Sequence, residues 1–114
     1  MTSYLAQYQK VQKRFSKKNS IRPCPGEIWF ASNVDGIKDR PILIFSVSGD
    51  HIACKKCTSR PNDIRRRVLI EDYINAGLEK DTYVDPEPKT LLRSDLLWKM
   101  GSLSEDDRRI LGFQ

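Results

Sequence analysis

The chain has 114 residues, of which 39% are hydrophobic and 31% are charged, a composition typical of one soluble globular domain. It has no apolar stretch of the roughly 18–20 residues that a membrane-spanning helix needs, and no apolar segment follows its basic N-terminus as in a signal peptide. Its three cysteines are an odd number, which argues against a framework of paired disulfides. We therefore expect a reduced, cytoplasmic, single-domain protein, and we exclude membrane proteins, secreted mini-proteins and multidomain enzymes.

The net charge of +5 is unevenly distributed along the chain. Residues 1–22 carry six of the 20 Lys and Arg residues and no acid, so the rest of the chain has 14 basic residues against 15 acidic ones. A second basic segment, Lys55–Arg67, holds six basic side chains and one acid. Clustered cations of this kind can bind phosphates, although a solvated loop has the same composition.

Residues 1–22 are predicted to form a basic helical arm that precedes a domain over residues 23–114. Apolar side chains recur in the arm at helical spacing, at Tyr4, Tyr8, Val11 and Phe15. This stripe could pack on the body of the protein, bind RNA or bind a partner.

Strand patterns begin at Glu27. Glu27–Ala31 is rich in β-forming residues, and Ile42–Val47 is a continuous apolar run typical of a buried central strand. Pro41 suits the start of that strand because it has no N–H to give to the sheet. The turn-forming residues Ser48-Gly49-Asp50 then predict a hairpin with a following strand at His51–Thr58.

The second half of the chain predicts short elements. A strand is expected at Val68–Ile70, and about one helical turn at Glu71–Ala76, ended by Gly77. Two separate extended pieces are expected at Tyr83-Val84 and Thr90–Leu92, with Pro86 and Pro88 between them at a sheet edge.

Two short helices are expected at the C-terminus. One is predicted over Ser94–Met100, and a capping box at Ser104 predicts another over Glu105–Leu111. The expected fold class is α+β, a small curled antiparallel sheet with short C-terminal helices and an added N-terminal amphipathic helix.

Only one arrangement of residues suggests a metal site. His51, Cys54 and Cys57 form an H-x-x-C-x-x-C pattern, and Cys24 could supply a fourth zinc ligand. Residues three apart on a strand point to opposite faces, however, so these side chains cannot converge without a tight turn. We expect no metal and no cofactor, and interpret the cysteines as small packing residues.

Several segments resemble, in order and spacing, the MazF/PemK family of toxins. They are Pro25–Ala31, Asp39–Ile44, Cys57-Thr58-Ser59, Ala76–Val84 and Met100–Ser104. The resemblance implies a curled sheet of the SH3-like barrel type, a homodimer, and metal-independent cleavage of single-stranded mRNA at short sequences. It also implies a cognate antitoxin whose acidic, disordered segment covers the RNA groove.

The same resemblance assigns catalytic roles to Arg40 and Thr58. Arg40 lies nine residues before Gly49 and Thr58 lies nine after it, so a hairpin centred on Gly49 brings them side by side. A guanidinium can stabilise the charge on a phosphate undergoing attack, and a hydroxyl can donate to the same phosphate. The group that takes the 2′-OH proton is left open between Arg40 and His51. A strand-end ion pair from Arg40 to Asp39 or Asp50 is the alternative, purely structural role.

Other residues are expected to bind substrate. These are Ser59, Lys56, Arg60, Arg65, Arg66, Asn33 and Lys38. Some relatives have an acid in the strand after the Gly77-Leu78 stretch, and either Asp85 or Glu87 could match it, because Pro86 and Pro88 obscure the register.

Two other functions compete with a ribonuclease toxin. A related fold occurs in CcdB toxins, which inhibit DNA gyrase by binding it, and the helix at Glu105–Leu111 would then carry the activity. The third hypothesis is a barrel that binds nucleic acid without cleaving it.

Overall fold

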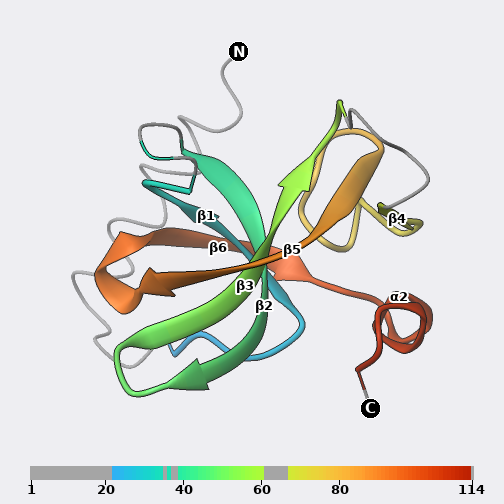
Figure 1. Ribbon diagram of the computed structural model, residues 1–114. Helices are drawn as coiled ribbons and strands as arrows, with labels where there is room; N and C mark the ends of the chain where they lie inside the picture. Colours follow the sequence, from blue (N-terminus) through green and yellow to red (C-terminus); the bar gives the residue numbers. More distant parts are fainter. Residues whose placement is uncertain (1–21, 35, 37–38, 61–66, 114) are drawn as a thin grey trace.

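The computed structural model describes residues 22–34, 36, 39–60 and 67–113. Within them six strands form one antiparallel sheet in the order β4-β5-β3-β2-β1-β6 (Figure 1). The strands are β1 (Glu27–Ala31), β2 (Arg40–Ser48), β3 (His51–Thr58), β4 (Val68–Ile70), β5 (Thr82–Leu92) and β6 (Leu96–Ser102). A 3₁₀ turn, η2 (Arg93–Asp95), precedes β6, and a helix, α2 (Glu105–Ile110), follows it. Residues 1–21 of the expected arm lie outside the described residues.

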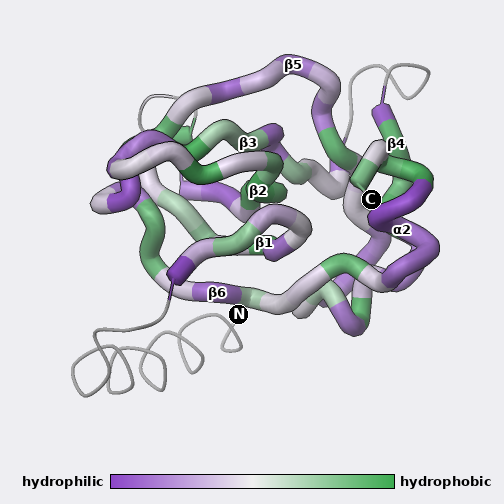
Figure 2. Tube along the Cα trace, turned by 90° about the horizontal axis from the view of Figure 1, so that it is seen from below, coloured by the Kyte–Doolittle hydropathy of each residue, from purple (hydrophilic) through white to green (hydrophobic). Residues whose placement is uncertain are grey.

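The three strands predicted for the first half of the domain are confirmed as β1, β2 and β3. Figure 2 shows their hydrophobic segments in the middle of the fold, with β5 and β6 passing on either side. Successive residues of β2 point to opposite faces of the sheet, so its apolar run supplies both faces. Leu43 belongs to one buried cluster, together with Ile28 and Cys57, whereas Ile42 and Ile44 belong to another.

The helix predicted over Ser94–Met100 is wrong, because this segment forms η2 and then strand β6. Asp95 makes the turn: its carboxylate accepts the N–H of Leu92, and its carbonyl accepts the N–H of Ser32 beside β1. The chain then pairs with β1, where Trp98 lies opposite Phe30 and stacks on it with ring centroids 4.6 Å apart. Pairing with a distant strand overrides the local helical pattern.

The two separate extended pieces predicted around Pro86 and Pro88 are one strand, β5, of 11 residues. The outer edge of β5 pairs with β4 over Thr82–Val84, so among the described residues the prolines lie beyond this pairing, where no outer neighbour needs an N–H. On the inner side the ladder breaks, because Lys55 pairs with Pro88 and Cys57 pairs with Val84. Three residues of β5 therefore lie opposite Lys56 alone.

Helix α2 begins at Glu105, as the capping box at Ser104 predicts. The Ser104 hydroxyl accepts the N–H of Asp107. The buried carboxylate of Asp107 accepts the N–H groups of Glu71 and Asp72 at 3.0 and 2.9 Å. The helix thereby holds the segment that leads to Gly77. None of the helices in the described part of the chain is long and apolar enough to cross a membrane.

The expected helical turn before Gly77 is a single hydrogen-bonded turn. Gly77 has a φ of +82°, and the N–H groups of Gly77 and Leu78 donate to the carbonyls of Ile74 and Tyr73. A Cβ at Gly77 would collide with the carbonyl of Met100 in β6. This turn therefore packs backbone against backbone on β6 and sends the following residues toward the beginning of β2.

Candidate active site

A cleft of about 880 Å³ lies where β2 begins and β3 ends. Its walls come from β1, β2, β3 and the start of β5, with the segments before β4 and after Gly77. The lining residues are Phe30, Asp39, Arg40, Pro41, Lys56, Cys57, Thr58, Ser59, Arg60, Arg67, Leu78, Glu79, Lys80 and Thr82. A volume of this size is typical of a ligand-binding site.

Arg40 and Thr58 both line this cleft, as the first residue of β2 and the last of β3. Ile42 pairs with Lys56, and two residues further along this register Arg40 comes opposite Thr58. Because residues alternate along a strand, Lys56 shares the face of Thr58. The structure therefore brings the two residues expected to be catalytic together with one expected to bind substrate.

A bulge in β2, and not a hairpin centred on Gly49, aligns Arg40 with Thr58. The hairpin turn is Gly49-Asp50, with Ser48 paired to His51, which by itself would set Arg40 opposite Ser59. A bulge between Ile44 and Ser46 shifts the register by one residue and restores the expected partner.

Thr58 and the residues after it present hydroxyl and cationic groups to the cleft. The Oγ1 of Thr58 accepts the N–H of Arg60 at 3.2 Å, which leaves its hydroxyl proton to be donated elsewhere. Ser59 and Arg60 are exposed. A bound anion can therefore accept hydrogen bonds from Thr58 and Ser59 and be attracted by the positive charge of Arg60.

The described lining of the cleft is predominantly cationic. Its cationic side chains are Arg40, Lys56, Arg60, Arg67 and Lys80, and its carboxylates are Asp39 and Glu79. A nucleic acid backbone carries one negative charge per nucleotide, so this excess of cations favours its binding.

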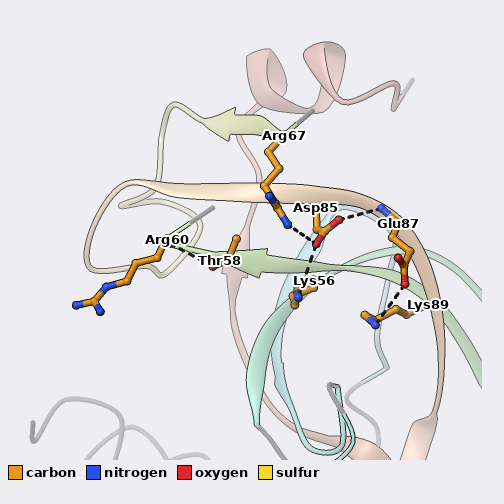
Figure 3. Close-up of polar contacts among 7 residues, drawn as sticks. All are labelled: Lys56, Thr58, Arg60, Arg67, Asp85, Glu87 and Lys89. Carbon is orange, nitrogen blue, oxygen red and sulfur yellow. Dashed lines mark hydrogen bonds and ion pairs between the residues drawn. The ribbon is translucent and has the colours of Figure 1, made fainter. Parts of the chain in front are cut away.

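Asp85 pairs with two of these cations, Arg67 and Lys56 (Figure 3). Its Oδ2 is 3.0 Å from Nη2 of Arg67 and 3.7 Å from Nζ of Lys56, and its Oδ1 accepts the N–H of Glu87 at 3.1 Å. Burial by itself raises the pKa of Asp85, but the Glu87 N–H, Arg67 and Lys56 outweigh that effect and lower the pKa below its usual range. Asp85 is therefore an anion at neutral pH.

The structure thus distinguishes the two acids that the sequence left open. Asp85 is 8% exposed and faces the cations of the cleft, whereas the Glu87 side chain is 74% exposed and pairs with Lys89 at 3.8 Å. Sequence reasoning did not find this three-charge cluster, because the bulge of β5 that creates it depends on pairing with β3.

The remaining predicted residues lie elsewhere. Asn33 is absent from the described lining of the cleft, and its amide donates to Asp95 of η2 at 3.4 Å. Lys38, Arg65 and Arg66 lie outside the described residues. His51 opens β3 at the end opposite Thr58, about 23 Å away at the rise of an extended strand, so it is too distant to serve as a base in the cleft. Asp50 is equally remote from Arg40.

The cysteines pack in the core. Cys54 and Cys57 belong to different buried clusters, as expected from strand alternation, and Cys24 is exposed. Burial raises the pKa of Cys54 to about 11 and also raises that of Cys57, so both thiols are protonated at neutral pH. Among the described residues no group of three or more His, Cys, Asp or Glu side chains is arranged to hold a metal ion.

Comparison with known proteins gives structural matches only. No family model and no curated protein matches the sequence. The solved structure of the Mycobacterium tuberculosis toxin MazF-mt6 matches with a TM-score of 0.62 and 22% identity, over 75% of this chain and 87% of that chain. An endoribonuclease from mycobacterial species matches with a TM-score of 0.60 and 15% identity, over 84% of this chain and 97% of that one. At these identities the likeness establishes the fold.

Proposed function

We propose that this chain, which has a MazF-like toxin fold, is a toxin endoribonuclease that cleaves single-stranded mRNA at specific short sequences without a metal ion. The observation that carries the proposal is the meeting of Arg40 and Thr58 in one cationic cleft. An arginine and a hydroxyl on adjacent strand ends suit a phosphodiester, because the guanidinium offers two donors and a full charge to the same group.

The proposed reaction is an attack by the ribose 2′-oxygen on the neighbouring phosphorus. The P–O2′ bond forms and the P–O5′ bond breaks, which leaves a 2′,3′-cyclic phosphate and a 5′-hydroxyl. Arg40 stabilises the charge that develops on the phosphoryl oxygens, and Thr58 and Ser59 donate to the same oxygens. The 2′-hydroxyl gives its proton to a carboxylate of the cleft, and water gives a proton to the departing 5′-oxygen.

The proton acceptor is proposed to be a carboxylate of the cleft. Asp39 and Glu79 are the acids in its described lining, whereas His51 lies at the far end of β3. An arginine with a pKa above about 12 is a poor base.

The RNA backbone is proposed to follow the cations of the cleft. Lys56 and Arg60 contact phosphates beside the scissile one, and Lys38, Arg65 and Arg66 are predicted to extend this path. Asn33, which faces η2, would reach only RNA that extends beyond the cleft. Bases of single-stranded RNA are unstacked, so their edges can be read by the surrounding loops.

Two protein partners belong to the proposal. A cognate antitoxin with an acidic, disordered segment would complement the cationic cleft and compete with RNA. The second partner is another copy of this chain, because we propose a homodimer. We also propose a sheet of the SH3-like barrel type and a site of action in the cytoplasm, where mRNA is found.

Cleavage of a phage RNA in EDTA, mapped by primer extension, tests the proposed function. The protein should cut at a recurring short sequence and leave a cyclic phosphate. Arg40→Ala should lower the rate about 10³-fold, because the charge contact to the reacting phosphate is lost. Arg109→Ala is the matched control, since Arg109 lies on α2 and pairs with Asp106 at the surface of the described part of the chain.

Other results would point to the competing functions. RNA binding with a steep salt dependence and no cleavage would indicate a noncatalytic nucleic-acid-binding protein. Inhibition of gyrase that depends on α2, with RNA left intact, would indicate a CcdB-like inhibitor. Equal cleavage rates for Arg40→Ala and the parent protein would refute the site assignment.

A further inference from the structure

We propose that Asp85 is a positioning residue that aims Lys56 and Arg67 at a second phosphate, next to the one that is cleaved. This inference rests on the proposed function, because it assumes that the cleft binds RNA. It adds Arg67 to the phosphate-binding residues and gives the buried acid a role that is separate from proton transfer.

The backbone places Asp85 there through the bulge of β5. Asp85, Pro86 and Glu87 lie opposite the single residue Lys56, between the paired positions at either end. Pro86 has no N–H to complete a ladder at this point. Bulges commonly turn a side chain away from its regular direction beside active sites, and this bulge brings the carboxylate to the Lys56 ammonium.

Three chain segments meet at the carboxylate. Lys56 comes from β3, Arg67 immediately precedes β4, and Asp85 belongs to β5 (Figure 3). The side chains of Lys56, Arg67 and Asp85 are 20%, 14% and 12% exposed. Both cations also line the cleft, so each has one side toward the acid and another toward the space where RNA would lie.

The charges of this cluster favour an incoming anion. Two cations held by one carboxylate leave a net charge of +1, which a phosphate would neutralise. The two cations lie 3.7 and 3.0 Å from the same carboxylate oxygen and are mostly buried, so without Asp85 they would repel each other and move apart. Asp85 therefore opposes RNA by its charge but supports RNA binding by its geometry, and the two effects predict opposite results when the acid is removed.

The hydrogen bonds of Asp85 argue against a role as the base. Oδ2 accepts from Arg67 and Oδ1 accepts from the N–H of Glu87, so both oxygens are engaged in the protein. The lowered pKa that these contacts produce also makes the carboxylate a weak proton acceptor.

The test compares Asp85→Asn with Glu87→Gln, an acid-to-amide change two residues away at an exposed position. The substrate is a 12-residue RNA centred on the cleavage site mapped for the parent protein. Asp85→Asn should lower kcat/KM about tenfold or more, mainly through KM, although it removes a negative charge from the cleft. Glu87→Gln should cleave at the parent rate.

A chemical change in the RNA separates positioning from a general loss of stability. A neutral methylphosphonate is placed in turn at each phosphate beside the scissile one. At one of these positions the parent protein should lose about tenfold in kcat/KM, whereas Asp85→Asn, Lys56→Gln and Arg67→Gln should lose little more, because the contact is already gone. The salt dependence of binding should also fall by about 0.7 in log–log slope for the lost contact.

Each result has a distinct meaning. A faster or unchanged Asp85→Asn enzyme would show that its charge alone matters and would overturn the proposal. Equal methylphosphonate losses in the parent and in all three variants would also overturn it. Lys56→Gln and Arg67→Gln keep the test valid if Asp85→Asn does not fold. If the parent protein cleaves no RNA, the proposed function itself fails, and the cleavage mapping reveals this first.

Discussion

Asp85 illustrates how the environment of a single side chain sets its chemistry. A buried carboxylate without partners would take up a proton, but here a backbone N–H and two cations keep it charged. Glu87, two residues away, stays at the surface with one lysine. The two acids look equivalent in the sequence and both belong to the bulge of β5, but only the Asp85 side chain is buried against Lys56 and Arg67.

The lowered pKa of Asp85 predicts a loss of stability in acid. The unfolded chain binds a proton at this carboxyl more readily than the folded protein does, so the contribution is present above the usual Asp pKa of about 4 and is lost as the pH falls through the lower folded value. In urea unfolding, the parent protein should exceed Asp85→Asn in stability at pH 6, and this difference should shrink as the pH falls from about 4 to 2. Glu87→Gln should show no comparable pH-dependent difference, and a constant gap for Asp85→Asn across this range would contradict the assignment.

Irregularities in the strands place the side chains of the cleft. The bulge in β2 sets Arg40 opposite Thr58, and without it the slip of one residue would leave these two side chains on opposite faces. The bulge in β5 brings Asp85 to Lys56. The regular parts of the same strands supply the buried clusters that hold both bulges in place.

The turn that ends at Gly77 is expected to tolerate no side chain. Its φ of +82° disfavours other residues, and a Cβ would meet the Met100 carbonyl of β6. Gly112, with a φ of +91° and open space around it, is the matched control. Gly112→Ala should lower the free energy of unfolding by about 1–2 kcal/mol. Gly77→Ala should lower it by more and should reduce cleavage, because Leu78 and Glu79 line the cleft; equal losses in urea denaturation would show that the backbone contact with β6 is unimportant.

Across the protein, the position of charge matters more than its total. The net charge of +5 comes from residues 1–22, whereas the cations of the cleft belong to a body whose charges nearly cancel. Asp107 of helix α2 binds the segment that leads to Gly77. The residues after Gly77 then line the cleft where β2 begins and β3 ends. Local charge and shape therefore support the proposed anion site, which the average composition does not indicate.

This distribution predicts that lysines of the N-terminal segment influence encounter with RNA but not catalysis. Replacing Lys10, Lys13 and Lys17 together with Gln lowers the net charge by three. At about 0.15 M salt, kcat on the 12-residue RNA should change less than about twofold, because long-range charge attraction speeds the encounter and does not act on the bound complex. The single change Lys56→Gln should lower kcat/KM more than the triple change does at the same salt. A loss of kcat well above twofold for the triple variant would place the N-terminal segment in the active site.

Much of the central hairpin could be predicted from the sequence alone, because its signals are local. The apolar run of β2, the glycine of the hairpin turn and the hydroxyl-capped start of α2 each depend on a few neighbouring residues. The pairing of Arg40 with Thr58 also followed from the hairpin, although a bulge was needed to produce it. Only the tertiary structure revealed β6, the continuous β5 and the cluster around Asp85, because each depends on hydrogen bonds to a strand distant in the sequence. A chain segment with mixed local preference adopts the conformation that satisfies its backbone against such a neighbour.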